Sequence, residues 1–224
     1  MNPVLVPLKR AALVGLVAVG MLFGVSPTSA QQAPNFDRAP QVIKIFNAIV
    51  SYPLPSWIKP PISLDQSEYY KDQQGPSFLL EQIPKGEKFE SWSRLYAVHG
   101  TVIKNGQNIT LDNYAFLNFG PLIKACGKEN ISLQRIHQSK HSQSFVVLCQ
   151  DTPHAQPGSG YGQGVGEVGL FRFTKFKNTF IKIYQEWRGQ SFDSTNNTTW
   201  PVSQEELKIM IRRFGYIKIT PTPK

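Results

Sequence analysis

The chain has 224 residues, with 24 Lys and Arg against 15 Asp and Glu, which gives a formal net charge of +9. Hydrophobic residues make up 41% of it and charged residues 17%, so the composition excludes a disordered chain and is typical of a globular protein with one core. The basic residues are spread out and no nucleic-acid-binding motif occurs, so we expect no nucleic-acid partner.

The N-terminus is typical of a secretory signal peptide over residues 1–30. Lys9 and Arg10 precede an uncharged run at 11–25, and small residues lead up to Ala30. The run is shorter than the roughly 20 residues of a membrane-spanning helix, although an uncleaved anchor is the alternative. We expect cleavage after Ala30, a periplasmic or secreted protein, and no transmembrane segment afterwards.

The only two cysteines are Cys126 and Cys149. In an exported protein such a pair predicts a disulfide, with two free buried thiols as the alternative. No histidine stands at ligand spacing from either cysteine, so we expect no metal site.

After a lead-in at 31–41 we expect a single α/β domain at 42–220 and a tail at 221–224. Residues 42–50 have helical spacing and predict a helix or a buried edge element. A proline-rich extended stretch follows, and 64–75 is a polar connection. The apolar runs 78–83 and 92–103 predict two strands joined by a corner at Pro84–Glu87, with Trp92 as a packing anchor.

The sequence Asn105-Gly106 predicts a hairpin with a short return strand at 108–111. Residues 112–126 predict a helix that ends at Cys126 and that Gly120-Pro121 either kinks or divides into two short helices. Its expected buried face comprises Phe116, Phe119, Leu122 or Ile123, and Cys126.

The segments 131–137 and 144–150 predict two strands, the second of them central in the sheet because it is apolar on both faces. The disulfide would then pin the helix onto the sheet. Residues 168–176 and 180–188 predict a hairpin. The last helix is predicted from its N-cap Ser203 to Gly215, before a short strand at 216–219.

In the strand 180–188, the side chains alternate between an apolar face and a partly solvated one. The solvated face carries Tyr184, Glu186 and Arg188, which we take as candidate binding residues. The glycine-rich stretch 151–166 lacks the register of a phosphate-binding loop, so we expect a loop at a sheet edge. Within this stretch, we take residues 157–166, which include Tyr161, as candidates for binding, because loops often contact partners.

No catalytic motif, metal-ligand spacing or cofactor motif occurs in the chain. The candidate for chemistry is His154, with Asp151 nearby in the glycine-rich region. Glu81, Glu87 and Glu186 could approach one another across the sheet, although charges on a sheet surface are the ordinary explanation.

The run Phe78–Glu87 followed by Trp92 resembles a pattern in small exported bacterial proteins of unknown function. The later order of cysteine-ended helix, cysteine-bearing strand and strand ending in Trp187-Arg188 is also similar to theirs. This resemblance covers about residues 45–190 and implies the α/β sandwich of the PsbP, Mog1 and DcrB group, an antiparallel sheet flanked by helices. Its characterised members mostly act as binding or assembly factors, and no catalytic residues come with the resemblance.

Together these patterns predict an α+β protein of the bacterial envelope or exterior that binds another envelope or secreted protein and is not an enzyme. A part in an envelope assembly or secretion machine fits this prediction. One alternative is a small hydrolase or ligand-binding enzyme that uses Asp151 and His154. The other is a protein that binds anionic surfaces through its net charge.

Overall fold

The computed structural model describes residues 40–156 and 158–223, together with their side chains except that of Gln107. The predicted signal peptide and most of the lead-in therefore lie outside the described residues. Among the described residues, no helix combines the length and apolar character needed to cross a bilayer.

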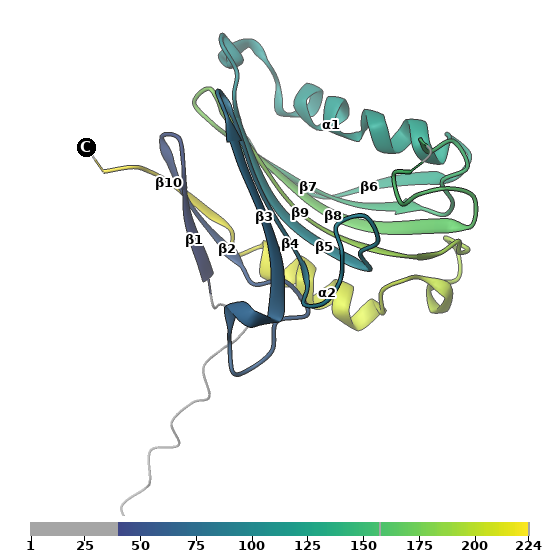
Figure 1. Cartoon of the computed structure of the whole chain (residues 1–224). Coiled ribbons are helices and arrows are strands. Elements are labelled where there is room, and N and C mark those ends of the chain that lie inside the picture. The colour runs from purple at the N-terminus through teal and green to yellow at the C-terminus, as the bar shows by residue number, and fades with distance from the viewer. Residues whose placement is uncertain (1–39, 157, 224) are drawn as a thin grey trace, which may run out of the picture. The chain divides into compact units, whose positions relative to one another are not determined.

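A seven-stranded antiparallel sheet forms the centre of the described chain (Figure 1). Its strand order is β3-β4-β5-β9-β8-β7-β6, so β3 and β6 are the edges. The hairpins β3–β4, β6–β7 and β8–β9 have short turns, as antiparallel pairing permits, whereas the long glycine-rich loop connects β7 to β8. The strands are β3 (Ser67–Gln74), β4 (Ser77–Pro84), β5 (Arg94–Val102), β6 (Ile131–Gln138), β7 (Ser142–Cys149), β8 (Val165–Phe176) and β9 (Thr179–Gln190).

A second, three-stranded sheet consists of β1 (Pro40–Ile45), β2 (Ala48–Pro53) and β10 (Lys218–Pro221), with β2 in the middle. The prediction of a helix at 42–50 is wrong, because this segment is the β1–β2 hairpin. Phe46 turns the chain with a φ of +51°, and Ile45 pairs with Ala48 across the turn.

Two helices cover opposite faces of the large sheet. Helix α1 (Leu111–Cys126) begins at Thr110, whose hydroxyl accepts a hydrogen bond from the Asn113 amide. Helix α2 (Gln204–Phe214) begins in the same way at the predicted N-cap Ser203. Short 3₁₀ turns occur at Leu64–Gln66, Gly106–Asn108 and Asn197–Thr199.

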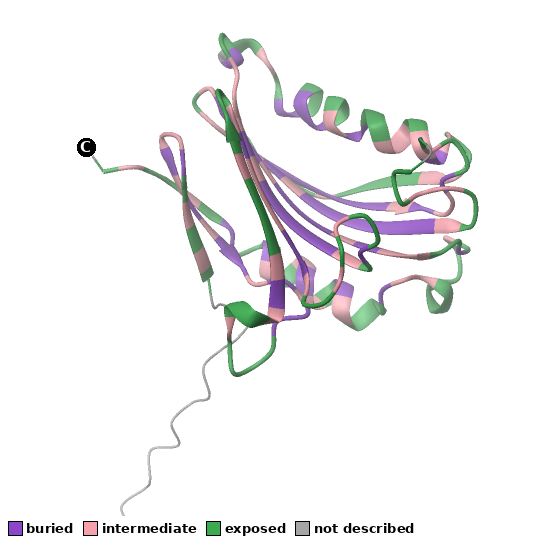
Figure 2. Ribbon diagram, viewed as in Figure 1, coloured by how far each residue is buried: buried purple, intermediate pink, exposed green. Residues whose placement is uncertain are grey.

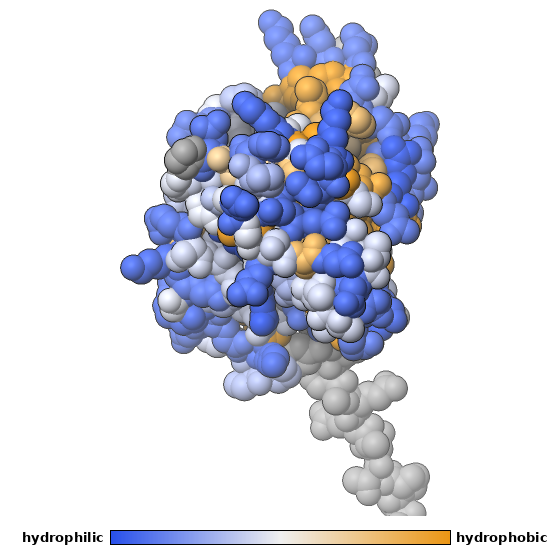
Figure 3. All heavy atoms as spheres, turned by 90° about the vertical axis from the view of Figure 1, so that its right-hand side faces the viewer, coloured by the Kyte–Doolittle hydropathy of each residue, from blue (hydrophilic) through white to orange (hydrophobic). Residues whose placement is uncertain are grey.

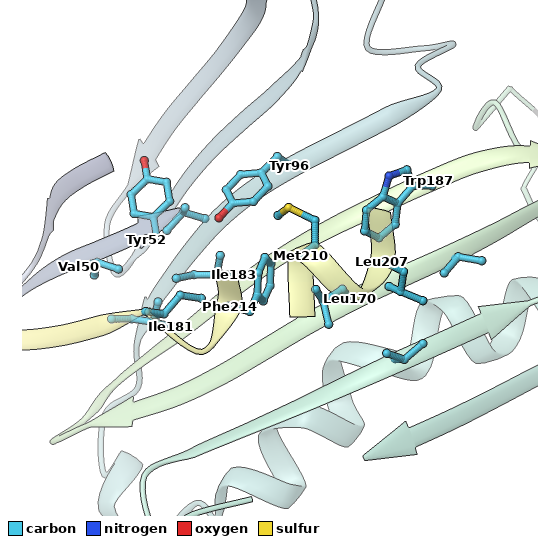
Figure 4. Close-up of a cluster of buried hydrophobic side chains, with 14 of the residues drawn as sticks. Val50, Tyr52, Tyr96, Leu170, Ile181, Ile183, Trp187, Leu207, Met210 and Phe214 are labelled. Atoms are coloured by element: carbon cyan, nitrogen blue, oxygen red, sulfur yellow. The ribbon is translucent and has the colours of Figure 1, made fainter. Parts of the chain in front are cut away.

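The alternation of strand side chains divides the interior into two cores, one on each face of the sheet (Figure 2). The first core lies between the sheet, α2 and the small sheet. In it Tyr96 and Phe214 meet edge to face at 6.1 Å between ring centres (Figure 4). The second core lies under α1, where Phe119 packs edge-on against the rings of Phe171 and Phe173.

The disulfide prediction is confirmed, since Cys126 and Cys149 are bonded with their Cα atoms 5.8 Å apart. The bond joins the last residue of α1 to the last residue of β7, which is an interior strand beside the edge strand β6. One end of α1 is therefore tied covalently to the sheet.

Three other predictions need correction. The polar segment 64–75 contains the strand β3, which tolerates polar side chains on both faces because it is an edge. Asn105 has a φ of +60° but leads into a 3₁₀ turn and α1, so there is no return strand at 108–111. Helix α1 runs through Gly120-Pro121 as one helix, so the alternative of two short helices is wrong.

Candidate functional site

A pocket of about 360 Å³ lies between α1 and the face of the large sheet that carries the second core. Apolar side chains from α1 and β8 line one part of it, among them Phe119, Leu122 and Phe171. Ionisable side chains from the sheet line the other part. Such a mixture of apolar walls and a few converging polar groups is typical of a ligand-binding site. The remaining lining residues are Asn118, Pro121, Ala125, Ala155, Gln156, Ser159, Tyr161, Glu167, Lys182, Tyr184 and Glu186.

Strand β9 supplies three of the ionisable groups, because its even-numbered residues face α1. Lys182, Tyr184 and Glu186 line the pocket, whereas Ile183 and Trp187 belong to the opposite core. This is the alternation that the sequence predicts for this strand. The candidate binding residues Tyr184 and Glu186 therefore lie at one site, but largely buried rather than on an open surface.

Two carboxyl groups from the paired strands β8 and β9 line this pocket together. Glu167 of β8 is only 1% exposed, and its charge acts on Glu186 of β9. The Tyr161 hydroxyl donates to Glu167 Oε2 at 2.5 Å, while the buried Oε1 has no hydrogen-bond partner among the described residues. Burial raises the pKa of both carboxyls, and the charge of Glu167 raises the pKa of Glu186 further. The pair is therefore stable when it holds one proton between its two carboxyl groups.

Lys182 lies next to this pair, with its ammonium nitrogen 4.4 Å from the centre of the Tyr184 ring. Burial lowers the pKa of Lys182, and the charges of Glu186 and Glu81 oppose that shift. Glu81 comes from β4 and accepts a 3.5 Å hydrogen bond from the Tyr184 hydroxyl. Strands β4, β8 and β9 thus bring three carboxyl groups and one ammonium group to the same face of the sheet.

Arg188 closes one side of the site and does not line the pocket itself. Its guanidinium carbon lies 3.6 Å from the centre of the Trp92 ring and 3.7 Å from that of Tyr161. One guanidinium nitrogen also donates to the Gly160 carbonyl at 3.4 Å. Its charge acts favourably on Glu167 and Glu186. The two candidate binding residues Arg188 and Tyr161 are therefore in direct contact.

The glycine-rich loop carries Tyr161 into the site. It connects β7 to β8, which are interior strands, so the expectation of a loop at a sheet edge is wrong. Thr152 is fully buried, and its hydroxyl accepts from the Gly162 amide and lies within donating distance of the Gly162 carbonyl. These bonds fasten the loop around the tyrosine.

Asp151 and His154 do not line the pocket under α1. The Asp151 carboxylate accepts hydrogen bonds from the amides of Thr152 and Gly164, both at 2.8 Å, and so helps to shape the loop. The His154 side chain is 59% exposed and lies 3.7 Å from a Glu129 carboxylate oxygen. His154 lines an adjoining hollow of about 410 Å³ beside α1, which shares Pro121, Ala125, Ala155 and Gln156 with the pocket. A catalytic role for the two residues stays a prediction.

The geometry limits the chemistry that the carboxyl pair can perform. Within residues 40–156 and 158–223, no group of three His, Cys, Asp or Glu side chains has the arrangement of a metal site. The arrangement can hold a proton or bind a cation.

Glu167 and Lys182 are ionisable pocket residues that were not among the candidates from the sequence. Glu167 interrupts the apolar run of β8, where a buried carboxyl is expensive unless it has partners. The available signal for Glu167 was one carboxyl residue within the otherwise apolar first half of β8. Its partners come from a loop and from β9, so the sequence alone could not identify them.

Part of the outer surface of α1 is apolar. Phe116 and Leu117 are 73% and 74% exposed, so the prediction that Phe116 lies on the buried face is wrong. Figure 3 shows a mainly hydrophilic face with hydrophobic atoms collected towards the top, the level at which α1 lies in Figure 1.

No protein-family model matches the chain, and no curated protein sequence matches it. Solved structures similar to it include the Ran-binding protein Mog1p of Saccharomyces cerevisiae, with a TM-score of 0.46 and 8% identity over 81% of this chain and 95% of that chain. A second is a mutant form of the protein Mog1, with a TM-score of 0.46 and 7% identity over 82% of this chain and 97% of that chain.

Proposed function

We propose that the protein is an exported, non-enzymatic binding protein of the bacterial envelope, and that the pocket under α1 is where it holds part of another envelope or secreted protein. The observation that supports this proposal most strongly is the buried Oε1 atom of Glu167, which has no hydrogen-bond partner within residues 40–156 and 158–223. Buried polar atoms of this kind usually have a partner, and a ligand can supply it.

The surroundings of the pocket agree with binding better than with catalysis. Among the described residues, the hydrogen bond to the Glu167 carboxyl comes from Tyr161 and not from a nucleophilic side chain. The disulfide ties α1, which covers the pocket, to the sheet. A site with a covalently fastened cover is preorganised, which lowers the entropy lost on binding.

A pair of leucine-to-tryptophan substitutions on α1 tests the location of the site. Leu122 lines the pocket, whereas Leu117 points outwards and is 74% exposed. We expect Leu122→Trp to fill the pocket and to abolish cross-linking to the partner that wild-type protein captures in envelope extracts. Leu117→Trp should retain that partner.

Thermal unfolding of both variants shows whether the fold is retained. Loss of the partner with Leu117→Trp alone would instead place binding on the outer surface of α1. Retention of the partner by a folded Leu122→Trp protein would exclude the pocket.

Export is tested by the mass of the protein recovered from the periplasm or the culture medium. We expect a mature chain that begins at Gln31, directly after the small residues that precede the cleavage point. Full-length protein found only in the cytoplasm would overturn this part of the proposal.

A further inference from the structure

We infer that the pocket under α1 binds a basic side chain, an ammonium group on an aliphatic stem as in lysine, beside the carboxyl groups of Glu167 and Glu186. This inference rests on the proposed function, because it names the chemistry of the ligand held at the same site. It follows from the charges around the pocket, the partners of each charged group and the shape of the walls.

The charges around the site do not balance. Glu81, Glu167 and Glu186 supply three carboxyl groups, and the cations that act on them are Lys182 and Arg188. Helix α1 contributes no ionisable side chain to the lining, and the tyrosines are neutral at ordinary pH. With all carboxyls ionised, the site is therefore one positive charge short.

The missing positive charge is the one that would balance the second carboxylate of the Glu167–Glu186 pair. The carboxylates of Glu81 and Glu186 both stabilise the charged form of Lys182. Arg188 is held against the faces of Trp92 and Tyr161. When no ligand is bound, a proton on the pair supplies the remaining positive charge. A ligand cation beside Glu167 Oε1 would supply it equally well and would release the proton.

The walls of the pocket suit an aliphatic stem that carries a cation. Phe119, Leu122 and Phe171 are apolar and line the pocket above the carboxyl groups. The Lys182 ammonium over the Tyr184 ring shows that a primary ammonium is accommodated against this aromatic floor. An anionic ligand would meet Lys182 but would also face the two glutamates, which argues against it.

Three probes of equal length separate the possibilities: n-pentylammonium, 1-pentanol and pentanoate. Each is titrated into the whole protein at pH 7 by calorimetry, in phosphate and in Tris, whose ionisation enthalpies differ. We expect pentylammonium to bind about tenfold or more tightly than pentanol. We also expect it to release up to about one proton per molecule bound, from the shared site of the pair.

Glu186→Gln is the diagnostic variant, because the amide keeps the shape of the side chain and can donate to Glu167 without an extra proton. It should lose the proton release and bind pentylammonium about tenfold more weakly. Glu205→Gln, in the exposed first turn of α2, is the matched control and should behave as wild type. Thermal unfolding of each variant confirms that it is folded.

The outcomes distinguish this inference from the proposed function. Tighter binding of pentanol or pentanoate, or binding of pentylammonium without proton release, would overturn the cation inference while the pocket remained a binding site. If none of the probes shifted the amide resonances of pocket residues such as Glu167 and Tyr184, both the inference and the pocket's role in binding would fall.

Discussion

The guanidinium group of Arg188 lies flat against Trp92, with 3.6 Å between the guanidinium carbon and the centre of the indole ring. Trp92 precedes β5, and Arg188 lies near the end of β9, where its backbone amide donates to the Ser93 carbonyl at 2.9 Å. The Tyr161 ring, which stands at 83° to that of Trp92, also contacts the guanidinium. A cation in contact with two aromatic rings thus joins the glycine-rich loop to the ends of two central strands.

Truncation of Trp92 should therefore be costly. We expect Trp92→Ala to lower the free energy of unfolding by about 3–5 kcal/mol, because it removes a large buried ring and the partner of Arg188. Trp92→Phe keeps an aromatic face and should cost clearly less. Urea unfolding followed by circular dichroism measures both, and equal losses for the two variants would contradict the role given to the aromatic face.

Gly160 and Gly158 provide a matched pair in the loop. Both have a positive φ, +74° and +78°, but a Cβ on Gly160 would lie 2.4 Å from the Glu90 carbonyl oxygen, whereas nothing lies within 4 Å of one on Gly158. Gly160→Ala should thus cost about 1–3 kcal/mol more than Gly158→Ala. Thermal or urea unfolding tests the difference, and similar values for the two variants would show that the loop moves freely away from Glu90.

The disulfide should contribute to stability as well as hold α1. Cys126 and Cys149 are 23 residues apart in sequence, and closing a loop of this size is worth about 3 kcal/mol in the chain-entropy model. Unfolding of the Cys126→Ser/Cys149→Ser protein should show a loss of this order, and added reductant should lower wild-type stability alone. Hydrogen exchange should increase most in the last turns of α1, and a uniform increase would contradict local fastening.

Because of the glutamate pair, we expect the free energy of unfolding to fall as the pH rises. The pKa of Glu186 is raised in the folded state, mainly by burial, so the folded protein binds its proton more tightly than the unfolded chain does. This contribution is complete below the unfolded pKa of about 4.3 and is lost as the pH rises through the folded pKa. Glu186→Gln should flatten that decline, by at most about 1.4 kcal/mol per pH unit for one proton. An unchanged slope would show that Glu186 is ionised throughout.

Because of His99, we expect a second contribution to the free energy of unfolding, one that falls as the pH decreases. Burial, followed by the charge of Lys182, lowers its pKa to about 4. The unfolded chain takes up this proton at about pH 6.5, so stability should be complete above that value and fall as the pH drops towards 4. His99→Gln, which can keep a hydrogen bond to Ser77, should remove this slope in urea unfolding between pH 4 and 7. A slope that persisted would assign it to other groups.

Local patterns in the sequence predicted most strands and both helices. Ser203 caps α2, and the alternation of β9 places Ile183 and Tyr184 on opposite faces. Errors arose where one sequence pattern is compatible with two kinds of secondary structure. The spacing of 42–50 suits a helix, but a two-residue turn at Phe46 divides it into a hairpin that is stabilised by pairing with β10, about 170 residues away in sequence.

The site could be predicted only in part, for a physical reason. Tyr184 and Glu186 are recognisable because they share a strand face. Their relation to Tyr161, Glu167 and Glu81 depends on strand order and on the path of the loop, which no local pattern encodes. The hydrogen bond from Tyr161 to Glu167 is likewise invisible in a sequence in which the tyrosine stands among glycines.

The residues of β9 face the pocket and the opposite core alternately. The length of this strand is therefore constrained more strictly than the identity of its residues. Inserting or deleting one residue within Phe180–Arg188 would carry Trp187 into the pocket and drive charged groups into the apolar layer beneath α2. Homologues with a different ligand should therefore differ here by substitution at even-numbered positions, while gaps are confined to the loop between β7 and β8.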